Sequence, residues 1–157
     1  MDDVNASELT GTLAFRLGIL GSLVSARFAD AVEPLGVKPK HVGLMAVLST
    51  GTPASQQEIA RTMGVMPSLV VGLADQLEAL GAIERVRDPD DRRRQKLSLT
   101  DTGRALLDTC LAVTNALDAD LTASLGAPDR DALRRILGTL AREAGLPGQS
   151  GTEGPSH

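Results

Sequence analysis

The stretch Ser55–Gly103, SQQEIARTMGVMPSLVVGLADQLEALGAIERVRDPDDRRRQKLSLTDTG, determines the fold of this chain. Ser55 and the glutamate three residues later match a capping box, in which each side chain satisfies a free backbone N–H group at a helix start. Gly64 follows where a tight turn needs a left-handed residue, and Pro67 suits the first turn of another helix. Gly81 is placed to end that second helix. The spacing therefore predicts a helix-turn-helix, with helices over 56–63 and 67–80.

Behind the second helix the sequence changes its period from helical to alternating. Polar and apolar residues alternate over 83–87 and again over 96–99, on either side of the polar, proline-containing segment Asp88–Arg94. Such alternation predicts two paired strands with a long tip. Thr100 then stands where it can cap a further helix. Helix-turn-helix followed by a hairpin is the order of a winged helix, a mainly α fold with a small β-hairpin wing.

The charge of the chain is unevenly distributed. The formal net charge is −4, yet Arg85–Lys96 holds six basic residues against three acidic ones, so this segment carries +3 and the remainder −7. A basic tip on two strands can reach the phosphates of DNA or its minor groove, where arginine is favoured. The alternative is a solvated loop in which Asp88, Asp90 and Asp91 balance the arginines. Its position directly after a helix-turn-helix favours the wing.

Helical periodicity flanks this module on both sides. We expect an N-terminal helix over about 7–32, a second over 39–49, a long one over 101–124 and a last one over 129–144. The long helix carries a narrow apolar stripe suited to a partner helix, formed by Leu106, Cys110, Val113, Leu117 and Leu121. The last is expected to bury Leu133, Ile136, Leu137 and Leu140. The predicted parts are a dimerisation helix (8–34), a DNA-binding domain (38–100), C-terminal dimerisation helices (101–144) and a disordered tail (145–157).

Composition excludes several function classes. With two Phe and no Trp or Tyr, the chain lacks the aromatic rings on which single-stranded nucleic acids stack. One cysteine and two histidines form no metal cluster or nucleophile–base pair by spacing, so we expect no enzyme, no metal and no cofactor. Without a signal segment or an apolar run of membrane-spanning length, the expected location is cytoplasmic.

These motifs resemble one known family. Residues 55–106 look like the core of the multiple-antibiotic-resistance regulator (MarR) family, most specifically in the spacing of DPDDRR (88–93), LT (99–100) and Gly103. LGVKPKHVGLMAVL (35–48) resembles the family's approach to its second helix, and the likeness extends over roughly 8–144. The resemblance implies a homodimeric, ligand-responsive transcriptional regulator, expected to be a repressor, that binds pseudo-palindromic double-stranded DNA.

The resemblance also assigns DNA-binding residues. In the wing, Asp91 is expected to orient the guanidinium of Arg93 into the minor groove, while Arg92 and Arg94 contact phosphates. On the helix-turn-helix the candidates are Ser55, Gln56, Pro67, Ser68, Leu69 and Gln76. The segment Leu69–Gly72 has few side-chain donors where family members often carry polar residues. Specificity is therefore expected to depend on the wing and on DNA shape.

Other residues leave alternatives open. Arg16 and His41 are candidates for an effector pocket, although a histidine at a helix start is more often a hydrogen-bonded structural group. Cys110 could be a redox switch, but a small buried hydrophobe is the commoner role on an apolar stripe. The sparse second helix also leaves open a winged-helix protein-interaction module that has lost DNA binding.

Overall fold

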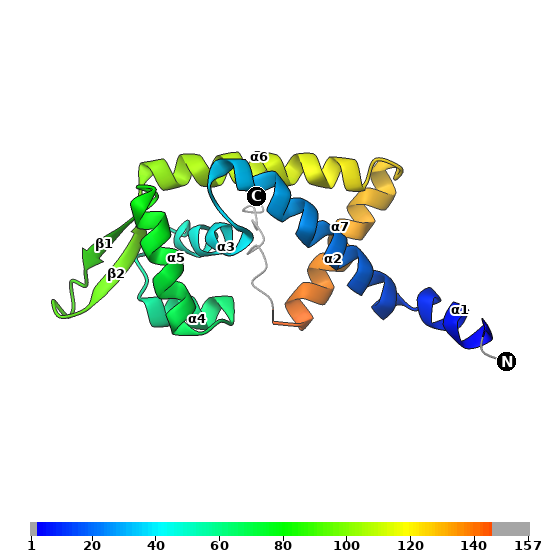
Figure 1. Ribbon diagram of the computed structural model, residues 1–157, viewed down its shortest axis with the longest axis horizontal. Helices are drawn as coiled ribbons and strands as arrows, with labels where there is room; N and C mark the ends of the chain where they lie inside the picture. Colours follow the sequence, from blue (N-terminus) through cyan, green and yellow to red (C-terminus); the bar gives the residue numbers. More distant parts are fainter. Residues whose placement is uncertain (1–2, 146–157) are drawn as a thin grey trace, which may run out of the picture. The chain divides into compact units, whose positions relative to one another are not determined.

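The computed structural model describes residues 3–145, and side chains from Ser7 on. The tail that the sequence predicts to be disordered lies outside these residues, apart from Gly145. The described residues divide into two compact units, 3–117 and 118–145. Figure 1 shows a helical chain with one two-stranded hairpin, labelled β1 and β2.

The first unit contains the predicted winged helix preceded by the N-terminal helices. Its elements are α1 (Asp3–Gly11), α2 (Leu13–Val32), the short 3₁₀ helix η1 (Glu33–Leu35), α3 (Pro39–Leu48), α4 (Gln56–Met63), α5 (Pro67–Ala79), β1 (Ile83–Arg87), β2 (Gln95–Leu99) and most of α6 (Asp101–Leu121). The second unit holds the end of α6 and α7 (Ala127–Glu143). The mainly α fold with a hairpin is therefore confirmed.

The helix-turn-helix forms through the local interactions that its sequence predicts. The Ser55 hydroxyl accepts from the Glu58 amide at 3.2 Å, and the Glu58 carboxylate accepts from the Ser55 amide at 2.7 Å. Gly64 ends α4 in the left-handed region at φ 65°, a conformation that glycine adopts without steric cost. Pro67 opens α5, and Gly81 follows its end at φ 70°. These local contacts set the turn between α4 and α5.

The hairpin is anchored to the end of α5 and the start of α6. β1 and β2 pair antiparallel, from Ile83 with Leu99 to Arg87 with Gln95. The Thr100 hydroxyl donates to the Gly81 carbonyl at 2.6 Å and accepts from the Gly103 amide at 3.0 Å. A Cβ at Gly103 would stand 1.9 Å from the Ala82 carbonyl oxygen, so only glycine permits this close approach. The base of the wing is thus held rigidly.

The core of the first unit lies between α3, α4, α5 and the hairpin, and α2 and α6 each contribute to it. Its largest fully buried side chains are Val32, Leu44, Met45, Leu48, Ile59, Val70, Leu77, Leu97 and Cys110. Burying an apolar side chain of this size contributes about 1.5–3 kcal/mol, so this cluster fixes the helices that carry the wing. Ala54 adds a short bridge to Leu97 of β2.

Two expectations about the flanking helices are corrected. The N-terminal segment is broken at Thr12, because this residue has an extended backbone and its hydroxyl accepts from the Phe15 amide at 3.3 Å, which starts a new helix. The long helix ends at Leu121, three residues early, in a turn in which the Leu125 amide donates to the Thr122 carbonyl.

The apolar residues of α7 were expected to be buried, and this is wrong for the single chain. Leu133, Ile136, Leu137 and Leu140 are 37–49% exposed. The described second unit holds only the end of α6 and the helix α7, so few neighbouring residues of this unit are available to cover the apolar side of α7. The result is an apolar face that is open to solvent.

Candidate nucleic-acid interface

The wing tip is closed by Asp88. Its side chain accepts from the Asp90 amide at 3.0 Å and lies 3.3 Å from Lys96 Nζ, and its own amide donates to the Arg94 carbonyl at 3.0 Å. The Asp90 hydrogen bond and the nearby Lys96 and Arg94 lower the pKa of Asp88. Asp88 and Lys96 therefore shape the tip, and the Lys96 ammonium is paired within the wing itself.

Asp91 pairs with a different arginine from the one that the resemblance suggests. Its carboxylate accepts from the backbone amide of Arg93 at 3.0 Å, and its other oxygen lies 3.4 Å from Arg94 Nε. The Arg94 amide also donates to the Asp91 carbonyl at 2.8 Å, which forms a tight turn. In this structure Asp91 orients the Arg93 backbone and the Arg94 guanidinium. The guanidinium of Arg93 does not pair with Asp91, because the turn brings the next side chain back instead.

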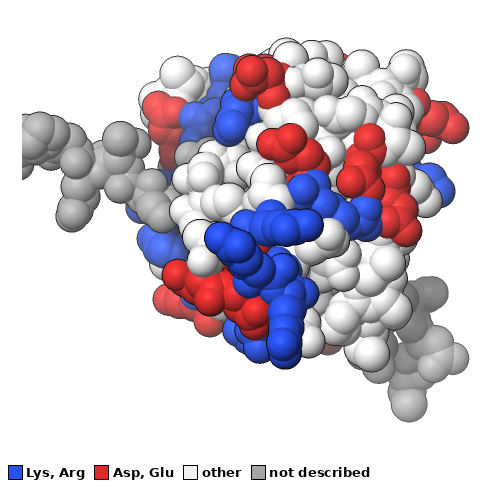
Figure 2. All heavy atoms as spheres, turned by 90° about the vertical axis from the view of Figure 1, so that its left-hand side faces the viewer, with Lys and Arg blue, Asp and Glu red and all other residues white. Residues whose placement is uncertain are grey.

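Three arginines of the wing have no acidic partner within residues 3–145: Arg87, Arg92 and Arg93. Figure 2, which faces the wing end, shows Lys and Arg as a continuous band bordered by Asp and Glu. The alternative to a wing, a solvated loop with balanced charges, therefore fits these side chains only in part. The carboxylates of Asp88 and Asp91 shape the tip, and the exposed guanidinium groups of the three arginines remain without an acidic partner in the described chain.

Arg85 has a role that the sequence reasoning missed. Its guanidinium bridges Asp75, at 2.5 Å, and Glu78, both on α5, and these carboxylates raise its pKa. The bridge ties strand β1 of the wing to the predicted recognition helix. The available signal was the three-residue spacing of the two acids, which places them on one helix face next to the strand.

A polar groove of about 460 Å³ brings the wing and the start of α4 together. It is lined by Ser55, Gln56, Gln57, Arg85, Arg93, Arg94, Gln95 and Leu97. Four predicted DNA-binding residues, two from the start of α4 and two from the tip, thus share one surface. Amide, hydroxyl and guanidinium donors in one groove suit the oxygens of a phosphate backbone.

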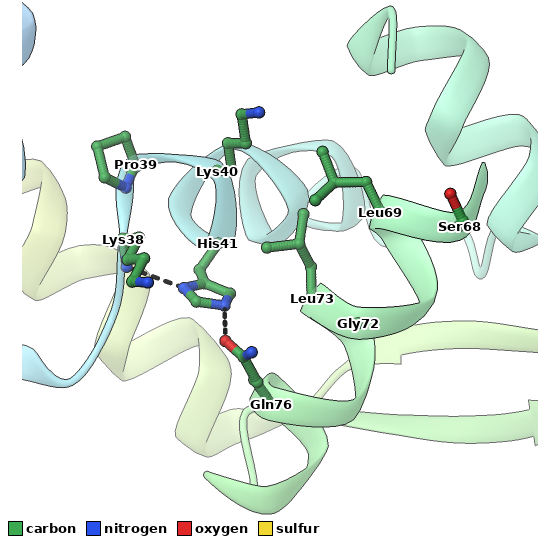
Figure 3. A pocket seen from close by; sticks show the side chains of 9 residues that line it. All are labelled: Lys38, Pro39, Lys40, His41, Ser68, Leu69, Gly72, Leu73 and Gln76. Atoms are coloured by element: carbon green, nitrogen blue, oxygen red, sulfur yellow. Dashed lines mark hydrogen bonds between the residues drawn. The ribbon is translucent and has the colours of Figure 1, made fainter. Parts of the chain in front are cut away.

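The recognition-helix candidates do not share one environment. Pro67 and Ser68 are exposed at the start of α5, whereas Leu69 is half-buried and packs on the core. Gln76 is exposed but hydrogen-bonded to His41 of α3 at 2.7 Å (Figure 3). Ser68, Leu69 and Gln76 line, with His41, a cavity of about 480 Å³ between the start of α3 and α5.

His41 is buried at the start of α3, with 3% of its surface exposed. Its Nδ1 accepts from the Lys38 amide at 2.9 Å, which caps the helix, and its Nε2 meets the Gln76 oxygen. Burial lowers the pKa of His41, helped by the charge of Lys38 and opposed by the Gln76 hydrogen bond. Arg16 does not line this cavity; its Nε donates to the Thr10 carbonyl at 3.3 Å.

Cys110 is fully buried in the core, and desolvation raises the pKa of its thiol. A thiol with these properties is a poor redox sensor, since the thiolate is the reactive form. No group of three or more metal-ligating side chains occurs within the described chain. None of the helices searched there is long and apolar enough to cross a bilayer.

Known proteins share this arrangement. The MarR family model matches residues 35–94. The transcriptional repressor MdtR of Bacillus subtilis is 30% identical over 140 residues, which cover 89% of this chain and 90% of MdtR. The chain belongs to the MarR family.

Solved structures of MarR-type regulators agree with this assignment. The transcriptional repressor CouR bound to a 23-mer DNA duplex is 34% identical, with a TM-score of 0.74, and the match covers 85% of this chain and 95% of that one. CouR from Rhodococcus jostii RHA1 bound to p-coumaroyl-CoA is 30% identical, with a TM-score of 0.68, and the match covers 85% of this chain and 94% of that one. The winged helix of this MarR family member is therefore the fold of its structural relatives.

Proposed function

We propose that this MarR family member is a transcriptional repressor that binds pseudo-palindromic duplex DNA as a homodimer. The observation that carries the proposal is the wing, which presents Arg87, Arg92 and Arg93 without acidic partners in the described chain beside a capped helix-turn-helix. Each phosphate that an arginine neutralises releases counterions, so such a surface binds DNA in a salt-dependent way. The DNA-bound CouR structure supports this proposal.

The division into parts follows from the same proposal. Residues 38–100 bind DNA, while 8–34 and 101–144 form the dimer. Exposed apolar side chains on α2, α6 and α7 support the second role: Leu13, Leu17, Ile19, Leu20, Leu23, Leu111, Leu121, Leu133, Ile136, Leu137 and Leu140. A monomeric protein rarely exposes so many large apolar residues, because they lower solubility. Two half-sites about 10 bp apart then place both modules on one face of the duplex.

A small-molecule effector is part of the proposal. The relative CouR is bound to p-coumaroyl-CoA in one of its structures, and in this chain the cavity beside His41 lies against the recognition helix. A ligand there would displace α5 relative to α3 and lower DNA affinity. Arg16 lies outside that cavity, so His41 is the residue of the predicted pair that we retain.

The second candidate is a winged-helix protein-interaction module, which the few donors in Leu69–Gly72 favour. Titration of the purified protein against a labelled pool of its own genomic DNA fragments, at several salt concentrations, separates the two. A DNA-binding wing makes log affinity fall steeply with log salt, and Arg93→Ala reduces both affinity and slope. Arg135→Ala, an exposed arginine of α7, is the matched control, and size-exclusion chromatography checks that this variant has the oligomeric state of the wild type. An affinity that Arg93→Ala leaves unchanged at moderate salt refutes the wing assignment.

A further inference from the structure

A chain of two hydrogen bonds connects the start of α3 to the recognition helix. The Lys38 amide donates to His41 Nδ1 at 2.9 Å, and His41 Nε2 lies 2.7 Å from Gln76 Oε1 (Figure 3). Because His41 is 3% exposed, water does not compete for its ring nitrogens. The linked residues are 35 positions apart in the sequence, and the bond joins a buried side chain to an exposed one.

The Lys38 amide determines the direction of the second bond. A backbone N–H can only donate, so His41 Nδ1 must be the unprotonated nitrogen of a neutral ring. The ring hydrogen is then on Nε2, and Nε2 donates to Gln76. The opposite orientation of the Gln76 amide would set its NH₂ group against the Nε2–H group, two donors facing each other. Burial, which lowers the pKa of His41, favours the same neutral form.

The exposed side of Gln76 is therefore its NH₂ group. Figure 3 shows the amide oxygen turned to His41 and the nitrogen on the other side of the amide. Gln76 follows Ser68 and Gly72 at four-residue intervals, so it lies on the same side of α5 as these two exposed positions. A freely rotating glutamine pairs with adenine by donating to N7 and accepting from the N6 amino group. The amide of Gln76 is turned so that its oxygen faces His41 and only its NH₂ group is directed outward, an orientation that does not suit this two-bond pair.

We propose that His41 is a positioning residue that makes Gln76 a donor-only contact, so that α5 selects guanine over adenine at the base pair that Gln76 meets. Guanine presents two acceptors in the major groove, N7 and O6, whereas adenine presents N7 beside a donor. The inference rests on the proposed DNA binding. His41, a buried histidine of α3, would then affect base preference without touching the DNA.

Selection from a library of duplexes with a randomised centre tests the assignment. The position whose preference disappears in Gln76→Ala should be guanine for the wild type, preferred over adenine by roughly fivefold, the ratio expected from one hydrogen bond. His41→Gln should keep that preference, because a glutamine at this position can accept from Lys38 and donate to Gln76. Glutamine and glutamate both suit this capping position.

His41→Glu is the decisive variant. The introduced carboxylate still accepts from the Lys38 amide, but it has no donor for Gln76, so the Gln76 amide turns over and presents its oxygen outward. The preference should then move from guanine towards adenine. Ala46→Glu adds the same charge at an exposed position of α3, the helix that carries His41, and should leave the guanine preference unchanged. Thermal unfolding checks that each variant is folded.

Gln76→Glu provides an arm that leaves the buried site unaltered. A carboxylate on α5 accepts only, so the preference should move to cytosine, whose N4 amino group is a donor. A guanine preference that disappears in Gln76→Ala but survives in His41→Glu, or a wild-type preference for adenine at the Gln76-dependent position, overturns the inference and leaves the proposed function standing. If the wild type enriches no duplex sequence, the proposed sequence-specific repressor function fails as well, and the inference with it.

Discussion

The carboxylate of Asp91 in the wing tip meets the guanidinium of Arg94, with Oδ2 3.4 Å from Nε, and holds Arg93 only by its backbone amide. The acidic residue thus acts as a turn-forming acceptor, and the side chain of Arg93 remains available. This relationship separates two properties of Asp91 that a DNA-binding experiment can distinguish: its hydrogen-bonding oxygen and its negative charge.

Substitutions at Asp91 should therefore differ by type. Asp91→Asn keeps an oxygen for the Arg93 amide and removes a charge that repels phosphates, so we expect duplex affinity equal to or above that of the wild type. Asp91→Ala removes both and should bind more weakly than Asp91→Asn, by about 1 kcal/mol, the value of one hydrogen bond. Fluorescence anisotropy with the same labelled duplex measures both. Equal affinities for the two variants would show that the turn does not matter.

Arg85 should couple the wing to the recognition helix. Arg85→Met leaves Asp75 and Glu78 without their partner, and we expect a loss of about 1 kcal/mol in the free energy of unfolding, since the pair is partly solvated. Duplex affinity should also fall, because two carboxylates on α5 are no longer neutralised. A double-mutant cycle with Asp75→Asn isolates the pairwise energy. Additive effects in that cycle would argue against the bridge.

Gly103 should tolerate no side chain. In Gly103→Ala the new Cβ would lie 1.9 Å from the Ala82 carbonyl oxygen, a backbone atom that cannot move away alone. We expect destabilisation of about 3 kcal/mol or more, in the upper range of single substitutions. Gly72→Ala is the control: its Cβ meets nothing within 4 Å, and alanine is the better helix former, so stability should rise by about 1 kcal/mol. Urea unfolding compares the two.

The stability of the chain should fall in mildly acidic solution because of His41. Burial lowers the pKa of His41 in the folded state below its ordinary value of 6.5, so the unfolded chain binds the proton more readily. The stability that neutral His41 contributes is fully present above pH 6.5, and it is lost as the pH falls through the lower pKa of the folded state. Protonation would also set Nδ1–H against the Lys38 amide.

The measurement is the free energy of unfolding between about pH 7.5 and about pH 5, a range above the titration of ordinary carboxylates. His41→Gln, which has no titrating group at this position, should show a flatter profile. A decrease of equal size in the wild type and in His41→Gln would assign the effect to other groups.

Local signals made much of this fold predictable. The capping box at Ser55, the left-handed glycine at position 64 and the alternation around Asp88–Arg94 each act over a few residues, and the structure has the helices and the hairpin where these signals place them. The break at Thr12 was missed, because the apolar periodicity continues through it and a lone threonine is a weak capping signal. The burial of α7 was overestimated, because periodicity identifies an apolar face without identifying what covers it.

The order of elements, the basic tip and the family resemblance can all be recognised in the sequence, because propensity, capping and charge are encoded within short segments. The tertiary structure decided which side chains are paired. Arg85 forms a bridge to α5, Asp91 pairs with Arg94, and Gln76 is hydrogen-bonded to buried His41. The sequence had instead predicted that Asp91 orients Arg93, that Gln76 contacts DNA and that His41 contacts an effector. The physical reason is that these pairings depend on the rotation and spacing of packed elements, which only the assembled core determines.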